Sequence, residues 1–134
     1  MTLRPKPHLL AVDDENDVLL ILKTSLREDY EVETASSGQE ALQKAPEFAP
    51  DIIILDLMMP DMDGITLLEK LRKEESLADT PVIFLTGVSD KTKLREALDH
   101  GTQFYIRKPF KPDELSAKVS QALHASGIGP PEEA

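Results

Sequence analysis

The sequence predicts an α/β fold in which five parallel strands form one sheet, with five helices on its two faces. Short apolar segments alternate strictly with amphipathic segments along the chain, an order typical of a doubly wound parallel sheet. The segment Asp51–Leu55 is β-branched and almost wholly apolar, which is typical of a central strand buried on both faces. The length of 134 residues suits one compact domain, which we expect to cover residues 1–126.

The first half of the chain is expected to contain three strands and two helices. His8–Val12 is an apolar run typical of a buried strand, and apolar residues recur at helical spacing within Glu15–Glu28. Ser37 and Glu40 have the spacing of a capping box, so we expect them to open a helix that ends near Pro46. The strands of this half are expected at His8–Val12, Glu31–Thr34 and Asp51–Leu55.

The second half continues the alternation. Asp63 and Gly64 can begin a helix whose leucines point inward, and Asp90–His100 is expected to form the next helix, with Gly101 as its stop. Pro112 suits the first turn of the last helix. The remaining strands are expected at Pro81–Leu85 and Gln103–Ile106, and residues 127–134, rich in Pro, Gly and Glu, are expected to form a flexible tail.

Composition excludes several classes of protein. The chain has 25 acidic and 15 basic residues and a net charge of −10, so we expect no direct binding to nucleic acid. It has no cysteine, which excludes disulfides and thiolate metal sites. The apolar runs are too short to span a bilayer, and the start lacks the features of a secretory signal. We therefore expect a cytoplasmic protein without membrane insertion.

Polar residues that could take part in binding or catalysis follow four of the five predicted strands. They are Asp13 and Asp14 after the first strand, Asp56 after the third, Thr86 after the fourth, and Lys108 and Pro109 after the fifth. Ligands of open parallel sheets bind beyond the carboxyl ends of the strands. If the strand order is 2-1-3-4-5, Asp56 lies between the acidic pair and the Thr86 hydroxyl, with Lys108 one strand further away.

Three carboxylates at one edge repel each other unless a cation lies between them. A hard divalent ion with oxygen ligands resolves this conflict, and we expect Mg²⁺, with Mn²⁺ as the alternative. Asp56 could then act as a nucleophile toward a phosphoryl group, while Lys108 and Thr86 neutralise the charge on the phosphoryl oxygens. Each residue alone has an ordinary structural role, such as a helix cap or a turn. Their coincidence at four strand ends favours the functional interpretation.

Four motifs carry a resemblance to a known family. They are Val12–Glu15, Leu55–Gly64, Leu85–Gly87 and Tyr105–Phe110. With these motifs the chain resembles, over about residues 7–126, the receiver domain of bacterial response regulators, of the chemotaxis type with a single domain. The resemblance implies a flavodoxin-like fold and a place in a two-component phosphorelay. Asp56 would accept a phosphoryl group from a sensor histidine kinase or a histidine phosphotransfer protein, and the domain would catalyse only this transfer and its own slow dephosphorylation.

The resemblance also assigns ligands and partners around the phosphoacceptor. Asp14 would bind Mg²⁺ directly, Asp13 would bind it directly or through water, and the backbone carbonyl of Met58 would be a further ligand. Lys108 would pair with the phosphoryl group, and the bond before Pro109 is expected to be cis, an isomer that proline makes accessible.

A conformational switch is implied at Thr86 and Tyr105. Phosphorylation would draw the Thr86 hydroxyl toward the new oxygens and let Tyr105 turn inward. This would change the face formed by the expected helix Asp90–His100, the strand Gln103–Ile106 and the last helix. A downstream protein would bind this face, and we expect no effector domain after residue 126. Exposed candidates for this contact are Lys91, Arg95, Asp99 and Lys118.

Two apolar residues predict slow loss of the phosphoryl group. Met58 lies two residues after Asp56, and Val88 lies two residues after Thr86. Neither side chain can orient an attacking water by hydrogen bonding. We therefore expect the substitutions Met58→Asn and Val88→Glu to speed dephosphorylation.

Two other classes of protein compete with this interpretation. A phosphatase of the haloacid-dehalogenase type also uses an aspartyl nucleophile, but it needs a second aspartate at the position that Met58 occupies. A flavin-binding electron carrier of similar topology would need phosphate-binding groups in the loop Asp13–Asn16, whose acidic side chains repel phosphate. Within the receiver interpretation, a stand-alone regulator and a phosphate shuttle both remain open, as do the kinase and the oligomeric state.

Overall fold

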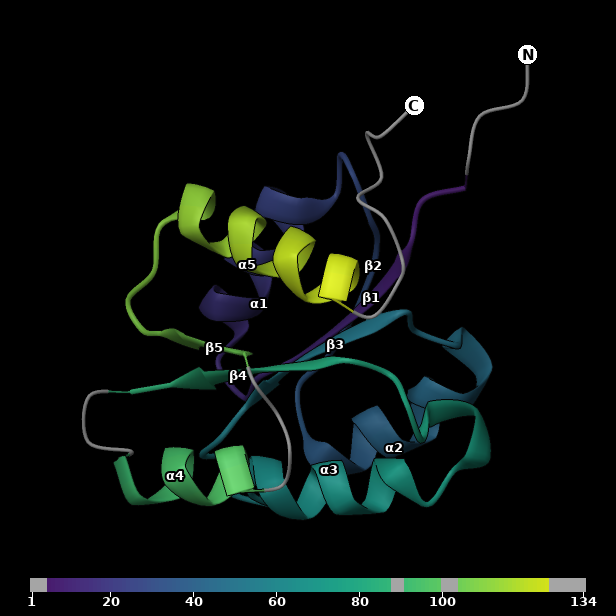
Figure 1. Ribbon diagram of the computed structural model, residues 1–134, viewed down its shortest axis with the longest axis vertical. Helices are drawn as coiled ribbons and strands as arrows, with labels where there is room; N and C mark the ends of the chain where they lie inside the picture. The colour runs from purple at the N-terminus through teal and green to yellow at the C-terminus, as the bar shows by residue number, and fades with distance from the viewer. Residues whose placement is uncertain (1–4, 88–90, 100–103, 126–134) are drawn as a thin grey trace.

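The computed structural model describes residues 5–87, 91–99 and 104–125, and in this part of the chain a parallel sheet lies between two layers of helices (Figure 1). The strand order is β2-β1-β3-β4-β5, so the predicted fold is confirmed. The elements are β1 (His8–Val12), α1 (Asn16–Leu26), β2 (Glu31–Ala35), α2 (Gly38–Phe48), β3 (Ile52–Asp56), α3 (Gly64–Arg72), a 3₁₀ turn η1 (Glu75–Leu77), β4 (Val82–Thr86), α4 (Lys91–Asp99), β5 (Phe104–Arg107) and α5 (Pro112–Ala125).

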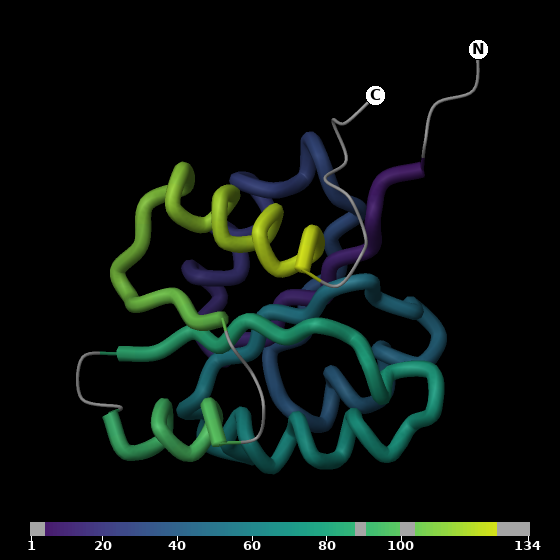
Figure 2. Tube along the Cα trace, in the orientation of Figure 1, coloured from purple at the N-terminus to yellow at the C-terminus, as the bar shows by residue number. Residues whose placement is uncertain are grey.

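The two faces of the sheet support two separate cores. Because side chains alternate along a strand, Leu10, Ile53 and Phe84 face α2, α3 and α4, whereas Leu9 and Ile54 face α1 and α5. In Figure 1 and Figure 2, α1 and α5 lie on one side of the strands, and α2, α3 and α4 lie on the other. Each fully buried aliphatic side chain contributes about 1.5–3 kcal/mol of transfer free energy. The central strand β3, buried throughout, is thereby held firmly where the site residues begin.

Helix α2 continues to Phe48, so the predicted end near Pro46 is wrong. Proline removes one N–H donor, but the backbone N–H of Ala49 still donates to Ala45 O at 2.9 Å and completes the last turn. The extension is held from β1: the His8 ring stacks on Phe48 with centroids 4.7 Å apart, and His8 Nδ1 lies 2.8 Å from Phe48 O. The two residues of α2 that follow its proline are thus in contact with a distant segment through Phe48.

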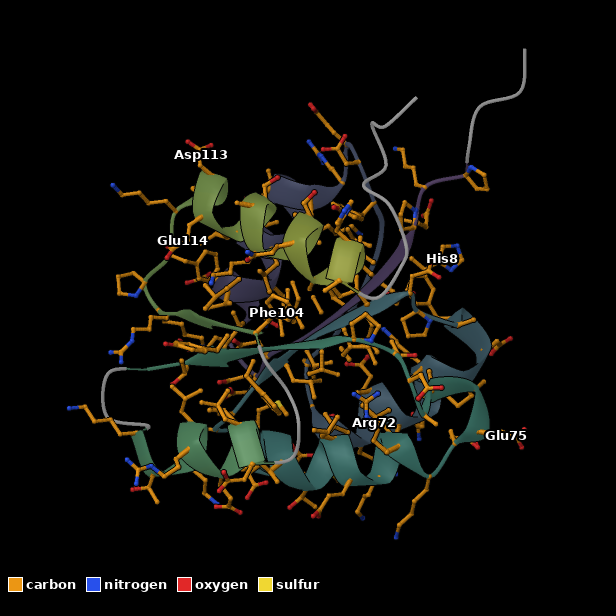
Figure 3. The ribbon with its side chains drawn as sticks, viewed as in Figure 1. His8, Arg72, Glu75, Phe104, Asp113 and Glu114 are labelled. Carbon is orange, nitrogen blue, oxygen red and sulfur yellow. The ribbon has the colours of Figure 1, made fainter. Side chains whose placement is uncertain are left out.

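The turn η1 was not predicted from the sequence, because three residues carry no periodic pattern. Arg72 holds this turn and the start of β4 together, since its Nη1 donates to Leu77 O at 2.9 Å and to Thr80 O at 2.5 Å. Figure 3 shows Arg72 and, at the outside of the turn, Glu75. Burial lowers the pKa of Arg72, although the charge of Asp79 acts in the opposite direction.

Several predicted features lie outside the described residues: Val88, Asp90, His100, Gly101, Gln103 and the tail 127–134. Within the ranges that the structure describes, no helix is long and apolar enough to cross a membrane.

Candidate functional site

The carboxyl ends of β1, β3, β4 and β5 bring the predicted site residues together. In the sheet Val12 pairs with Leu55, Asp56 pairs with Leu85, and Thr86 pairs with Arg107. Asp13, Asp14 and Lys108, which follow directly on strands β1 and β5, therefore reach the same edge as Asp56. One carboxylate oxygen from each of Asp13, Asp14 and Asp56 lies within 4.8 Å of the other two, so the predicted acidic cluster exists.

The three carboxylates differ in exposure and in how they are held. Asp13 is fully buried and Asp56 is 5% exposed, whereas Asp14 is exposed. Asp13 Oδ1 accepts a hydrogen bond from the Glu15 N–H at 2.9 Å, and Asp56 Oδ1 accepts one from the Met58 N–H at 3.3 Å. One oxygen of each buried carboxylate is thus fixed by the following loop, and the other is left for a charged partner.

Lys108 is that partner. Its Nζ lies 2.7 Å from Asp13 Oδ2, 3.5 Å from Asp56 Oδ2 and 3.4 Å from Glu15 Oε1. The backbone at Lys108 is held by a hydrogen bond from the Lys108 N–H to Thr86 O at 2.8 Å. The Lys108–Pro109 bond is cis, as expected. The contact of Glu15 with Lys108 was not predicted from the sequence. The position of Glu15 directly after the acidic pair could have indicated it.

The electrostatics of the cluster follow from burial. The pKa of Asp56 is raised to about 7, first by burial and then by the charge of Asp13, while Lys108 and the Met58 N–H act in the opposite direction. Burial also raises the pKa of Asp13, despite its contacts with Lys108 and Glu15. Burial alone would lower the pKa of Lys108, but the surrounding carboxylates outweigh it and raise that pKa. The lysine therefore stays charged beside the two buried carboxyl groups.

The donor set fits a hard divalent cation. All three groups offer oxygen ligands, which Mg²⁺ prefers, and the exposed Asp14 leaves room for waters. Asp13 Oδ2 is buried and faces the Lys108 Nζ atom at 2.7 Å. One lysine lies beside a cluster of three carboxylates, so a cation between the carboxylates would lower the remaining repulsion.

The loop between β3 and α3, which we call the acceptor loop (residues 57–63), wraps tightly around the end of β3. The Gly64 N–H closes it by donating to Leu57 O at 2.9 Å. A Cβ atom built on Gly64 would lie 2.6 Å from Asp56 O, so this helix start can approach the strand only as glycine. Met58 lies in this loop with 49% of its surface exposed.

The two switch candidates lie on neighbouring strands. Thr86 is buried, and its Oγ1 donates to Gly87 O at 3.2 Å. Tyr105 is half-buried and packs against the core beneath α4. Of the four surface candidates, Lys91, Arg95 and Asp99 are exposed, but Lys118 is only partly exposed, so its predicted exposure is wrong. Lys118 lies three residues after buried Leu115 and four before buried Ala122, on the same side of α5, which explains the difference.

Comparisons with known proteins agree with this geometry. The family model of the response regulator receiver domain matches residues 9–120. The chain is 39% identical over 124 residues to the alkaline phosphatase synthesis transcriptional regulatory protein PhoP of Bacillus subtilis, covering 92% of this chain and 51% of that protein. It is 42% identical over 116 residues to the transcriptional regulatory protein SrrA of Staphylococcus aureus, covering 86% and 47%. The chain thus spans about half the length of these curated relatives.

Solved structures agree as well. The chemotaxis protein CheY4 of Vibrio cholerae superposes with a TM-score of 0.83 at 34% identity, covering 88% of this chain and 99% of that one. The receiver domain of a signal transduction histidine kinase from Syntrophus aciditrophicus gives a TM-score of 0.79 at 34% identity, with 89% and 91% covered. The chain therefore belongs to the response regulator receiver domain family, the response regulators of two-component signalling.

Proposed function

We propose that Asp56 accepts a phosphoryl group, in a reaction that depends on Mg²⁺, from a sensor histidine kinase or a histidine phosphotransfer protein. One observation carries this proposal: the Asp56 carboxylate, 5% exposed, lies beside two further aspartates and 3.5 Å from a lysine ammonium. A role as a turn residue does not explain why a buried carboxylate lies next to two aspartates and a lysine. It is well placed as a nucleophile whose product needs neutralising.

Asp13, Asp14 and Asp56 would hold the cation, with the Met58 carbonyl as a further ligand. When bound, Mg²⁺ (or Mn²⁺) neutralises the repulsion between the carboxylates and the charge that develops on the phosphoryl oxygens. A carboxylate oxygen of Asp56 then forms the new bond to phosphorus, while the bond between phosphorus and the donor's imidazole nitrogen breaks and its electron pair leaves with the imidazole. Lys108 is already within 3.5 Å of Asp56 and can pair with the transferred group.

The same lysine and Thr86 would transmit the change. The new phosphoryl oxygens would draw Lys108 from Asp13 and would attract the Thr86 hydroxyl away from Gly87 O, which it contacts at 3.2 Å. Tyr105, half-buried next to α4, would take up the vacated space. The face formed by α4, β5 and α5 would then present a different surface to a downstream partner protein.

The domain would act as a signalling acceptor in the cytoplasm and not as an enzyme on other substrates. It would catalyse its own phosphorylation and a slow dephosphorylation, because exposed Met58 offers no hydrogen bond to an attacking water. We propose that residues 1–126 form this receiver domain and that residues 127–134 are a flexible tail.

Acetyl phosphate gives a direct test of the proposal. The purified protein is incubated with acetyl phosphate and Mg²⁺, and its intact mass is measured with and without a chelator. We expect a gain of one phosphoryl group that the chelator abolishes. A protein that gains no phosphoryl group with Mg²⁺ present, or gains it equally with the chelator, would overturn the proposal. Passing label onward to a histidine phosphotransfer protein would assign the shuttle role.

A further inference from the structure

Asp61 fastens the acceptor loop to the start of α2. Its Oδ1 accepts a hydrogen bond from the Gly38 N–H and its Oδ2 accepts one from the Gln39 N–H, each at 3.2 Å. The first N–H groups of a helix have no partner within the helix, and a negative charge there is stabilised by the helix dipole. The helix also has a cap of its own, because Ser37 Oγ accepts from the Glu40 N–H at 3.1 Å. Asp61 therefore supplies a second cap, which reaches across from another segment.

Packing reinforces these two bonds. A Cβ atom built on Gly38 would lie 3.0 Å from Met62 Cβ and 3.0 Å from Met62 Sδ, so the loop rests directly on the first turn of α2. Glycine at this position is what allows the close approach. The loop and the helix start are consequently fixed relative to each other at Asp61 and Met62.

The segment that carries Met58 is short and held at both ends. On one side the Leu57 N–H donates to Leu85 O at 3.0 Å and continues the sheet. On the other side Asp61 is bonded to α2, with buried Met59 packed into the core between them. The Met58 side chain itself is 49% exposed. The position of the Met58 backbone is therefore set by its neighbours, and Asp61 is the polar anchor on the far side.

We propose that Asp61 is a positioning residue for the cation site: through its two bonds to α2 it holds the Met58 carbonyl in place as a ligand. The inference rests on the proposed function, in which that carbonyl binds Mg²⁺. Asp61 does not belong to the cluster of Asp13, Asp14 and Asp56, and it acts only through the loop. Residues that orient metal ligands without touching the metal commonly change metal affinity by about 10–100-fold when removed.

The test compares two variants that uncap the same helix. Asp61→Ala removes the anchor, whereas Ser37→Ala removes the helix's own cap and leaves the bonds of Asp61 in place. Both are expected to lower the midpoint of thermal unfolding. Mg²⁺ affinity of the phosphate-free full chain is measured by isothermal titration calorimetry. We expect about tenfold weaker binding for Asp61→Ala and unchanged binding for Ser37→Ala.

Asp61→Asn extends the test to a conservative change. Asparagine keeps one acceptor oxygen but presents an amide donor to the second N–H, so we expect affinity between that of the wild type and that of Asp61→Ala. If Asp61→Ala does not fold, the comparison of Asp61→Asn with Ser37→Ala decides the matter by the same rule. Asp61 variants that bind Mg²⁺ as tightly as Ser37→Ala would overturn the inference alone. A wild-type protein that binds no Mg²⁺ would overturn the proposed function and the inference together.

Discussion

The Nζ atom of Lys93 lies 3.2 Å from Oδ2 of Asp63, so an ion pair joins α4 to the end of the acceptor loop. The other oxygen of Asp63, Oδ1, caps α3 by accepting from the Thr66 N–H at 2.8 Å. Although burial favours the neutral acid, the hydrogen bonds from Thr66 and Lys93 outweigh it and lower the pKa of Asp63. The loop that follows Asp56 is thus tied to α3 and α4 through one carboxylate.

Breaking this pair is expected to loosen α4 without uncapping α3. In Lys93→Gln the cap to Thr66 is retained, so we expect faster hydrogen exchange of the α4 amides and little change in the thermal midpoint. Lys91→Gln, an exposed lysine on the same helix, is the control. Equal exchange of α4 in the two variants would show that the pair does not restrain the helix.

The metal-free protein is expected to become more stable when Asp56 loses its charge. The pKa of Asp56 is about 7 in the fold but about 3.9 in an unfolded chain, so the folded state binds more protons between these values. The free energy of unfolding should therefore fall as pH rises from about 4 to about 7. Denaturant unfolding with a chelator present should find Asp56→Asn more stable than the wild type by about 1–3 kcal/mol at neutral pH and above, with the gain vanishing near pH 4.

If instead the free energy of unfolding of the wild type rose relative to that of Asp56→Asn with increasing pH, the result would contradict a raised pKa of Asp56. Adding Mg²⁺ at neutral pH should reverse the ranking, because the wild type gains binding free energy that the variant lacks.

Loss of the phosphoryl group is expected to depend on the side chain at position 58. Met58→Asn places a hydrogen-bonding amide where an exposed thioether now lies, so an attacking water can be oriented and hydrolysis should be several-fold faster. Decay of the phosphorylated species is followed by intact mass. Met58→Leu, which stays apolar, should decay like the wild type, and the idea fails if the leucine and asparagine variants decay alike.

Gly64 is expected to tolerate no side chain. A Cβ atom there meets Asp56 O at 2.6 Å, a backbone atom that cannot move without disturbing β3. Gly64→Ala should lower the free energy of unfolding by about 1–3 kcal/mol, as overpacking commonly does. Gly38→Ala, also at a helix start, meets the Met62 side chain at 3.0 Å and should cost less. Denaturant titration of both variants measures their free energies of unfolding. Equal decreases in the two variants would refute the role of the contact with Asp56 O.

Local pattern in the sequence was sufficient to predict the sheet and the convergence of its strand ends. Parallel pairing places Asp13, Asp56 and Lys108 at one edge once the strands are recognised. Two of the features that were missed depend on contacts between distant segments. The ring of His8 stacks on Phe48 at the end of α2, beyond Pro46, and the bonds of Asp61 to α2 join residues 22 and 23 positions apart. The hydrophobic periodicity of a sequence does not predict which carboxylate caps which helix.

The most direct test of the account is uptake of radiolabelled phosphate from acetyl phosphate, with Mg²⁺ present, by the wild type, Asp56→Asn and the surface variant Asp29→Asn. The account predicts labelling of the wild type and Asp29→Asn but none of Asp56→Asn. Labelling of Asp56→Asn at the wild-type rate would contradict it.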